Sequence, residues 1–591
     1  MDGMQISKIL KEARKFAKTA LACEKYDIKI AVLGSCSIQY FVLLLRYYLF
    51  QNGITADIYE GEYNGIAMDV LDAGSGLYSF APDAVIILPD YRDIKAYPKL
   101  LCDEDASQLC AGFIDGYKKM WAALTNRLPG ITVLQGNFVL PLESPLGNLE
   151  ANYKFSRRSF IRRINGELLN VRPANVILVD MEYLASAIGK RTWFDNSQYF
   201  LTKMPCSLEC LWDLTELFAK QILALKGKVR KCLVLDLDNT LWGGVVSEEG
   251  CDGINLDPNN AVGESYLAFQ QYVLPLKERG VILAVCSKND EEVAKEPFMK
   301  NRYMKLKLTD IACFVANWED KASNIKRIAK ELNIGLDSMV FFDDNPAERE
   351  VVRQFLPMVE VIEAPEDPSD YVTALDEAMA FEWTQLTKED IARNQSYIAE
   401  TQRREMAGSF VDYGDYLKAL DMRARIGIVL DNQIARFSQL INKSNQFNLR
   451  TQRYSEQTIA EYMKSDDAKC ISAELRDKFS DYGLISCVIL RRAGTVCFID
   501  TWVMSCRVLK RGLEYMMFEH ILSAAREWDC RAVVGEYIPT AKNGMVKDLY
   551  ETLGFVPAES VEEIHKTTDD SALYSFDTAA EPSKKYYISA E

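Results

Sequence analysis

The chain has 591 residues, which is too many for a single hydrophobic core and predicts about three to four domains. Its formal net charge of −16 argues against a nucleic-acid-binding surface, because contacts with phosphates need clustered Lys and Arg side chains. The most apolar stretch, residues 41–50, is too short to span a bilayer, so we expect no membrane segment.

Residues Met1–Leu21 form a charged, amphipathic helical pattern without the small-residue cleavage site of a secretory signal. The fifteen cysteines lack paired C-x-x-C spacing, and no histidine lies near the closest pair, Cys206 and Cys210. We therefore expect reduced thiols, no zinc site and a cytoplasmic location. His520 and His565 are the two histidines, so most of the chain lacks an imidazole base.

The first segment, residues 1–205, alternates short apolar runs with helical stretches. The expected strands are 28–33, 84–88, 131–134 and 176–179. Runs that are apolar on both faces are typical of a parallel sheet covered on both sides by helices. Residues 206–228 are expected to form a connecting helix.

A second α/β unit is expected over residues 229–365, with strands at 232–235, 281–285, 311–315 and 339–342. An acidic, proline-rich break ends it, and residues 366–408 are predicted to form a helical linker. The last domain, residues 409–578, combines strands at 484–490, 496–502 and 532–537 with a helix at 513–528. The polar tail after Thr578 is expected to be frayed.

Asp236 and Asp238 follow the predicted strand 232–235 directly. Side chains two positions apart on a strand share a face, and open α/β sheets bind ligands at the carboxyl ends of their strands. Adjacent carboxylates without a counter-ion are costly, and a divalent cation removes this cost. Because the ligands are oxygens, the sequence predicts a magnesium site.

Further polar residues follow in chain order at strand ends and helix starts. Ser287 ends the second strand of this unit, Lys321 opens a helix, and Asp343 and Asp344 follow the fourth strand. A carboxylate nucleophile divides a difficult displacement into easier steps, and a lysine neutralises charge on phosphoryl oxygens. Solvated loop residues would explain one such motif, but they explain a complete ordered set poorly.

In this order, the motifs resemble those of the haloacid dehalogenase superfamily. The resemblance implies that Asp236 attacks phosphorus and forms an aspartyl-phosphate. It implies that Asp238 protonates the leaving oxygen and later activates water, a general acid and base role. Ser287 and Lys321 would hold phosphoryl oxygens.

The magnesium ligands implied by the same resemblance are Asp236, Asp238 through its carbonyl oxygen, and Asp343, with Asp344 in support. The short spacings between the motifs leave no room for a separate cap domain. An open site of this kind suits a substrate tethered to a protein, or one that a neighbouring domain covers.

The last domain resembles the GNAT acyltransferase fold in its Asn543, Leu549-Tyr550-Glu551 and Leu553-Gly554-Phe555. Residues 505–512 resemble the loop whose amides bind the pyrophosphate of a phosphopantetheine-bearing acyl donor. The implied donor-binding residues are Arg507, Arg511, Gly512 and Asn543. Lys510 stands where the family has glycine, although a lysine can itself pair with a phosphate. An ordinary strand-to-helix loop is the alternative.

The first domain resembles the SGNH hydrolase fold, with Ser35 at the nucleophile position, Asn137 at an oxyanion position and Asp180 after a later strand. Tyr183 stands where that family has histidine, and residues 1–205 contain no histidine at all. Because a serine without a base is a weak nucleophile, we expect a non-hydrolytic domain used for docking or for covering substrate.

The three domains together resemble the FkbH-like proteins. The expected fold class is α/β and multidomain: an SGNH-like doubly wound parallel sheet, a capless haloacid dehalogenase Rossmann-like domain and an α+β GNAT-like domain. The matching stretches include LDLDNTLWGGVV at 235–246, FDDNPAE at 342–348, INKSNQFNL at 441–449 and DYGL at 481–484.

The resemblance implies a glyceryl transferase with Mg²⁺ as cofactor. Such proteins take the glyceryl unit of 1,3-bisphosphoglycerate, a small phosphorylated three-carbon acid, and remove its remaining phosphate. They load the unit on the phosphopantetheine thiol of an acyl carrier protein. Our hypothesis for an acyl-carrying enzyme thiol is Cys506, with Cys286 as second choice.

Two other functions stay open: a capless phosphatase that acts on a small or protein-tethered phosphate ester without acyl transfer, and a non-catalytic carrier-protein adaptor. The complete motif set favours an enzyme over the adaptor. The 441–449 stretch fits no chemical motif. Its Lys443, Asn445 and Gln446 are able to bind an anion or carboxylate, or else they form a solvated helix end.

Overall fold

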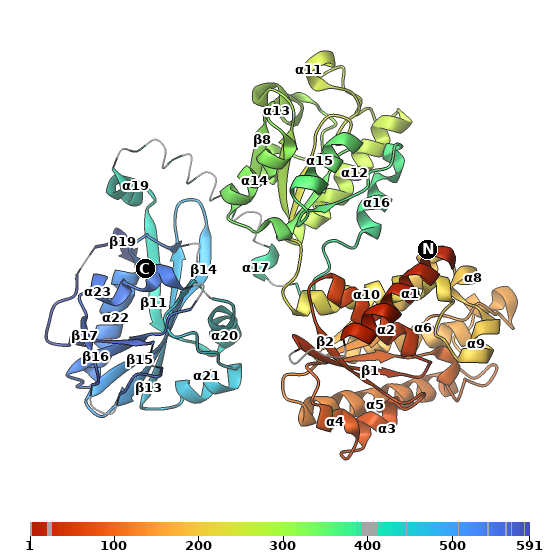
Figure 1. Ribbon diagram of the computed structural model, residues 1–591, viewed down its shortest axis with the longest axis horizontal. Helices are drawn as coiled ribbons and strands as arrows, with labels where there is room; N and C mark the ends of the chain where they lie inside the picture. The colour runs from red at the N-terminus through yellow and green to blue at the C-terminus, as the bar shows by residue number, and fades with distance from the viewer. Residues whose placement is uncertain are drawn as a thin grey trace. The chain divides into compact units, whose positions relative to one another are not determined.

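Figure 1 shows the computed structural model, which describes residues 3–20, 26–386, 388–391, 397, 399, 403, 406, 410, 412–444, 446–505, 508–540, 543–561, 564–568, 570–583 and 585–591. Its strands form one sheet in each of the N-terminal, middle and C-terminal parts of the described chain. None of the described helices is long and apolar enough to cross a membrane.

The N-terminal sheet is parallel, as the sequence predicted, with strand order β2-β1-β3-β4-β5. Its strands are β1 Ile28–Gly34, β2 Ala56–Glu60, β3 Ala84–Leu88, β4 Thr132–Gly136 and β5 Val176–Val179. Alternate side chains of β1 enter different cores: Ile30 packs with Phe41 and Phe218, whereas Leu33 packs with Trp121. Both faces of the sheet are therefore buried, which explains the continuous apolar runs.

Helices cover both faces of this sheet. Figure 1 shows α1, α2 and α10 on one face and α3, α4 and α5 on the other. The helices are α1 Gly3–Ala20, α2 Gln39–Gln51, α3 Ile66–Leu71, α4 Gly76–Phe80, α5 Asp103–Arg127, α6 Arg157–Val171, α7 Met181–Ile188, α8 Lys190–Trp193, α9 Asn196–Thr202 and α10 Leu211–Leu225. The expected connecting helix is α10, and it packs its buried face against α2.

The middle sheet has the order β10-β9-β6-β7-β8. Its strands are β6 Cys232–Leu235, β7 Ile282–Ser287, β8 Cys313–Ala316, β9 Met339–Phe342 and β10 Glu360–Val361. The chain runs outwards from β6 through β7 and β8, then returns to the other side of β6 as β9. Such a reversal of strand order is the usual place for a ligand site in α/β sheets.

The helices of the middle part are α11 Val246–Glu249, α12 Ala261–Glu278, α13 Glu291–Lys300, α14 Lys321–Leu332, α15 Pro346–Phe355 and α16 Tyr371–Glu377. Side chains at their first turns satisfy the free backbone amides. Asp320 caps α14 by accepting a hydrogen bond from the Ser323 amide, and Asn345 caps α15 by accepting one from the Ala347 amide. Asn345 belongs to the quoted stretch 342–348, and Asp320 directly precedes Lys321.

The C-terminal sheet is mixed, as expected for an α+β domain, with order β17-β18-β16-β15-β14-β13-β11-β19 and β12 paired to β15. The strands are β11 Met422–Ile428, β12 Phe447–Asn448, β13 Ala468–Arg476, β14 Asp481–Ala493, β15 Val496–Met504, β16 Ala532–Tyr537, β17 Val556–Ala558, β18 Ala572–Asp577 and β19 Ile588–Ala590. The helices of this part are α17 Lys388–Ile391, α19 Tyr413–Ala419, α20 Ile434–Lys443, α21 Glu456–Met463, α22 Leu513–Glu527 and α23 Leu549–Thr552.

The expectation of a frayed tail after Thr578 is wrong. Ile588, Ser589 and Ala590 form β19 and pair in parallel with β11. The Glu591 amide adds a hydrogen bond to the Ala424 carbonyl. A free strand edge on β11 explains why this short polar segment becomes ordered, because it satisfies backbone groups that would otherwise lack partners.

A buried ion pair joins the predicted linker to the C-terminal domain. Arg403 donates to both carboxylate oxygens of Asp477, from Nε at 2.7 Å and from Nη2 at 2.8 Å. The side chains are 1% and 0% exposed. Arg511 also donates to Asp477, at 3.2 Å. Burial raises the pKa of Asp477, but the hydrogen bonds and charge of Arg403, together with the bonds from the Phe479 and Ser480 amides, outweigh this effect and hold the pKa below its usual range.

We expect Asp477→Asn to destabilise the C-terminal domain by about 3–5 kcal/mol, because it leaves buried arginines without their counter-charge. Thermal unfolding of the full chain measures this change. The Asp477 contribution is present above the pKa of the unfolded chain and is lost as the pH falls through the lower folded value. The exposed pair of Asp415 and Lys418 provides the control, since Asp415→Asn should change stability by less than about 1 kcal/mol. Equal effects of both substitutions would contradict this prediction.

Candidate phosphoryl-transfer site

Asp236 is the first residue after β6, at the position where the strand order of the middle sheet reverses. One carboxylate oxygen from each of Asp236, Asp343 and Asp344 lies within 4.8 Å of the others. Asp236 and Asp343 are buried and Asp344 is half-buried. The structure therefore brings together three residues that the sequence assigned to magnesium.

Lys321 supplies positive charge to this cluster. It is the first residue of α14 and is 2% exposed. Its Nζ donates to Asp236 Oδ1 and, at 2.7 Å, to the carbonyl oxygen of Cys286. A buried ammonium group held by a carboxylate and a carbonyl is well placed to bind phosphoryl oxygens.

Ser287 is the last residue of β7 and is buried. Its carbonyl oxygen accepts a hydrogen bond from the Asn317 amide at 3.2 Å, which fixes the loop before Lys321. Two residues further along the same loop, Asn289 donates to Asp238 Oδ2 at 3.1 Å. These bonds connect the loops after β6, β7 and β8.

Asp238 lies in the loop after β6 instead of on the strand, and its carboxylate is outside the group of Asp236, Asp343 and Asp344. It accepts hydrogen bonds from Trp242 Nε1 at 2.9 Å, the Val246 amide at 3.0 Å and Asn289. Burial raises the pKa of Asp238, the nearby Asp236 charge adds to this, and the hydrogen bonds oppose it. A carboxyl group with a raised pKa is suited to general acid catalysis.

The loop after β9 is fixed by a residue that the sequence reasoning missed. Arg349 donates from Nη1 to the carbonyl oxygens of Asp343 at 2.8 Å and Asp344 at 2.7 Å, and from Nη2 to Glu363 at 2.7 Å. Arg349 directly follows the motif that contains Asp343, so its position in the sequence could have indicated a role at the site. Trp242 likewise occurs within the quoted stretch 235–246, and Asn289 lies two residues after Ser287. Only the structure shows that both hold Asp238.

The donor set of this cluster fits Mg²⁺. Its atoms are carboxylate oxygens from different loops, and hard oxygen ligands are those that this cation prefers. Close carboxylates also need a positive charge to offset their repulsion, and one lysine offsets only part of it. Asp236, Asp343 and Asp344 would hold the ion, with the Asp238 carbonyl as the further predicted ligand.

The residues predicted to bind an acyl donor are only partly within the described chain. Cys506 and Arg507 lie outside the described residues. Arg511 is buried and donates to Asp477 and Tyr482, and Gly512 is the N-cap residue before α22, at a φ of 85°. Lys510 adopts a φ of 61°, a left-handed conformation typical of the glycine that it replaces. The second candidate thiol, Cys286, is completely buried.

In the N-terminal domain, Ser35, Asn137 and Asp180 follow β1, β4 and β5 at one edge of the sheet. Ser35 Oγ accepts a hydrogen bond from the Asp90 amide at 2.7 Å. Asn137 Nδ2 donates to Asp180 Oδ1 at 2.7 Å, so its amide already has a carboxylate partner. The non-hydrolytic role of this domain stays a prediction.

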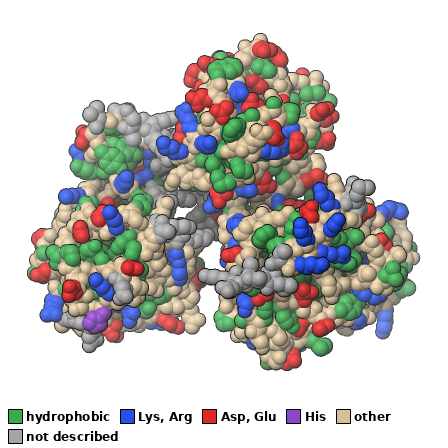
Figure 2. Space-filling model, in the orientation of Figure 1, with side chains coloured by type: hydrophobic (Ala, Val, Ile, Leu, Met, Phe, Trp, Pro, Cys, Tyr) green, Lys and Arg blue, Asp and Glu red, His purple; other side chains and the backbone are tan. Residues whose placement is uncertain are grey.

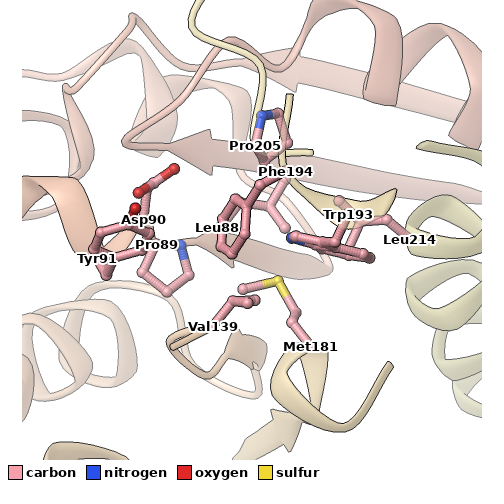
Figure 3. Close-up of a pocket in the computed structure, with 10 residues that line it drawn as sticks. All are labelled: Leu88, Pro89, Asp90, Tyr91, Val139, Met181, Trp193, Phe194, Pro205 and Leu214. Atoms are coloured by element: carbon pink, nitrogen blue, oxygen red, sulfur yellow. The ribbon is translucent and has the colours of Figure 1, made fainter. Parts of the chain in front are cut away.

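A small pocket lies beside Ser35 at the same edge of the N-terminal sheet. Figure 3 shows the Asp90 carboxylate at one end and Trp193 and Leu214 at the other, with Met181 and Val139 below. Most of the lining is apolar, and Asp90 is held by Arg92 at 2.8 Å. Burial raises the pKa of Asp90, and the adjacent guanidinium opposes this.

The middle sheet and its clustered carboxylates have the arrangement expected of a haloacid dehalogenase-like domain. In sequence and structure the chain is similar to the N-terminal part of the protein BF1531 from Bacteroides fragilis, which contains a phosphatase domain and was crystallised with Mg. The identity is 35% over 64% of this chain and 99% of the other, with a TM-score of 0.59. Residues 29–223 match the model for the FkbH N-terminal domain. The chain belongs to the FkbH-like family.

Two further solved structures each cover about a quarter of the chain. The ribosomal-protein-S18-alanine N-acetyltransferase from Escherichia coli matches 28% of this chain and 99% of its own, at 15% identity and a TM-score of 0.21. The GNAT domain of S. lividans PAT matches 27% and 94%, at 18% identity and a TM-score of 0.21. These likenesses are too weak to assign an activity. No curated protein matches the sequence.

We expect Mg²⁺ to stabilise the folded chain, because an ion that binds only the native state raises its stability by mass action. At about 100 times Kd the gain is about 2.7 kcal/mol. The measurement is the midpoint of thermal unfolding with and without Mg²⁺. Asp343→Asn should abolish this shift, whereas the exposed Asp252→Asn should retain it. An unchanged shift in the Asp343 variant would show that the ion binds elsewhere.

Proposed function

We propose that the chain is a Mg²⁺-dependent phosphatase and acyl transferase that loads a dephosphorylated glyceryl unit from 1,3-bisphosphoglycerate onto an acyl carrier protein. The observation that carries the phosphatase part is the cluster of Asp236, Asp343 and Asp344 beside the Lys321 ammonium group. The acyl-transfer part rests on membership of the FkbH-like family.

In the phosphatase step, an oxygen of Asp236 attacks phosphorus, the bond from phosphorus to the leaving oxygen breaks, and an aspartyl-phosphate forms. Asp238 gives its proton to the leaving oxygen, and in the second step it removes a proton from the attacking water. The second step releases inorganic phosphate and restores Asp236. Lys321 and Ser287 hold the phosphoryl oxygens. Bound Mg²⁺ would supply the remaining positive charge that this transfer needs.

In the acyl-transfer step, the carrier thiol attacks the acyl phosphate carbon, a thioester forms and phosphate leaves. The acyl phosphate is already activated, so this step needs positioning more than chemical activation. The remaining phosphate ester needs the Asp236 site. A capless site is open enough to admit a phosphate ester on a long, protein-bound arm.

We expect Asp236→Asn to abolish hydrolysis of the phosphate ester and Asp238→Asn to lower kcat for this hydrolysis about 10²–10⁴-fold, since the latter removes the general acid. Phosphate release and the intact mass of holo-acyl carrier protein are measured together, with 1,3-bisphosphoglycerate and Mg²⁺. Asp252→Asn is the matched control. Phosphate release without a mass gain on the carrier would favour the plain phosphatase. A carrier that gains the dephosphorylated glyceryl mass with Asp236→Asn would contradict the assigned nucleophile.

A row of lysines on α1 supports an acidic protein partner. Lys8, Lys11, Lys15 and Lys18 recur at helical spacing on its outer side, and all are exposed. Figure 2 shows Lys and Arg side chains gathered over this helix, in a chain whose net charge is −16. The structure shows no ion pair for these lysines within its described residues. An exposed cationic helix face fits an acidic carrier protein, because complementary charge speeds association.

We expect Lys11→Glu/Lys15→Glu to raise KM for the carrier by about tenfold or more at low salt, while release of phosphate from a small ester stays unchanged. The effect should shrink as salt screens the charges. Lys118→Glu/Lys119→Glu, an equal charge change on exposed α5 lysines, is the control. Equal effects of the two double variants would reject α1 as the docking surface, and acidic vesicles that bind wild type but not the variant would indicate a membrane instead.

A further inference from the structure

The parallel strands β15 and β16 separate along their length. They pair only from Val496 with Ala532 to Ile499 with Gly535, although β15 continues to Met504. The other edge of β15 pairs with β14 up to Met504. Beyond Ile499, the edge of β15 that faces β16 is therefore the edge open to another strand.

Residues 447–449 occupy the end of this gap, opposite Val503 and Met504. β12 pairs antiparallel with β15, with Phe447 opposite Met504 and Asn448 opposite Val503. On the other side, the Ile538 amide, one residue beyond β16, donates to the Leu449 carbonyl oxygen at 2.9 Å. The same short segment thus bridges both of the separated strands.

Asn543 clamps the segment in place. Its Nδ2 donates to the carbonyl oxygens of Asn448 and Ile538, each at 2.9 Å, and its Oδ1 accepts from the Thr540 amide at 2.7 Å. The Asn543 side chain is completely buried. The residue that the sequence assigned to an acyl donor is instead used to hold the chain's own backbone.

Packing also keeps the segment inside the domain. Phe447 and Leu449 are 5% and 1% exposed, and Asn448 is 0% exposed. The Phe447 ring lies 6.1 Å from that of Trp502 on β15. Asn448 Nδ2 donates to the Ser444 carbonyl oxygen and its Oδ1 accepts from the Thr451 amide at 2.7 Å. Leaving the gap would expose these apolar side chains and break each of these bonds.

The gap is the place where an acyl donor would have to lie. The predicted pyrophosphate loop, residues 505–512, follows β15 directly. A phosphopantetheine arm that starts on this loop and runs along β15 presents its amides to the strand edge, as a peptide does when it adds to a sheet. β14 pairs with one edge of β15. On the other edge, β12 pairs with Val503 and Met504, near the end of the strand.

We propose that residues 447–449 are a built-in strand that occupies this position, so that the C-terminal domain takes no phosphopantetheine-bearing donor into the gap. The proposal gives the INKSNQFNL stretch a structural role, since its last residues are the ones that close the gap. It goes beyond the proposed function and holds whether or not the phosphatase activity is found. Acyl transfer would then take place outside this gap.

The test is hydrogen–deuterium exchange of the full-length chain with and without millimolar coenzyme A, which carries the phosphopantetheine arm. The expected result is unchanged exchange at the Ile538 amide and at residues 447–449, even if coenzyme A binds elsewhere on the chain. Faster exchange at these residues when coenzyme A is added would overturn the proposal, because it would show that the arm displaces the segment.

A variant tests the clamp itself. Asn543→Ala removes the two bonds from Nδ2 and should raise Ile538 exchange by at least about fivefold in the absence of ligand, since the loss of one hydrogen bond alone has about this effect. Asn259→Ala, in an exposed loop, is the control and should leave Ile538 unchanged. Unchanged exchange in the Asn543 variant would contradict the clamp. If this variant does not fold, the wild-type measurement with coenzyme A still decides the question.

Discussion

The site depends on carboxylates that are held close together at the carboxyl ends of the strands of the middle sheet. Asp236, Asp343 and Asp344 come within 4.8 Å of one another, and like charges at this distance oppose folding. Lys321 offsets part of this repulsion through its contact with Asp236. A divalent cation therefore has a large electrostatic reason to bind here. The strand order around β6 produces the arrangement, because it brings residues from distant parts of the sequence to one edge.

Around this cluster, polar side chains fix the loops so that the site needs little rearrangement. Arg349 holds the backbone of Asp343 and Asp344, and Asn289 and Trp242 hold Asp238. Fixed dipoles and charges of this kind are worth more than mobile ones, because they need no reorganisation when charge develops on the substrate. The burial that makes them effective also raises the pKa of Asp238.

The C-terminal domain shows how backbone pairing limits function. Separated parallel strands leave unpaired amides and carbonyls, and such groups need partners when they are buried. In this chain, residues 447–449 provide the partners. A loop that resembles a donor-binding motif therefore adjoins a gap that is already filled. Within that loop, Lys510 adopts the left-handed conformation that is typical of glycine.

The sequence determined the α/β organisation, most strand positions and the residues of the carboxylate cluster. Apolar runs such as AVIIL at 84–88 have one stable environment, the interior of a covered parallel sheet, and Lys321 opens its helix as its motif predicted. Only the tertiary structure decided what depends on long-range pairing. In the folded chain, the end of the polar tail pairs with β11, and Arg403 forms a buried ion pair with Asp477. Asp238 accepts a hydrogen bond from Trp242, and residues 447–449 lie between β15 and β16. A local pattern records which face of a segment is apolar, but it does not record which distant strand edge or counter-charge lacks a partner.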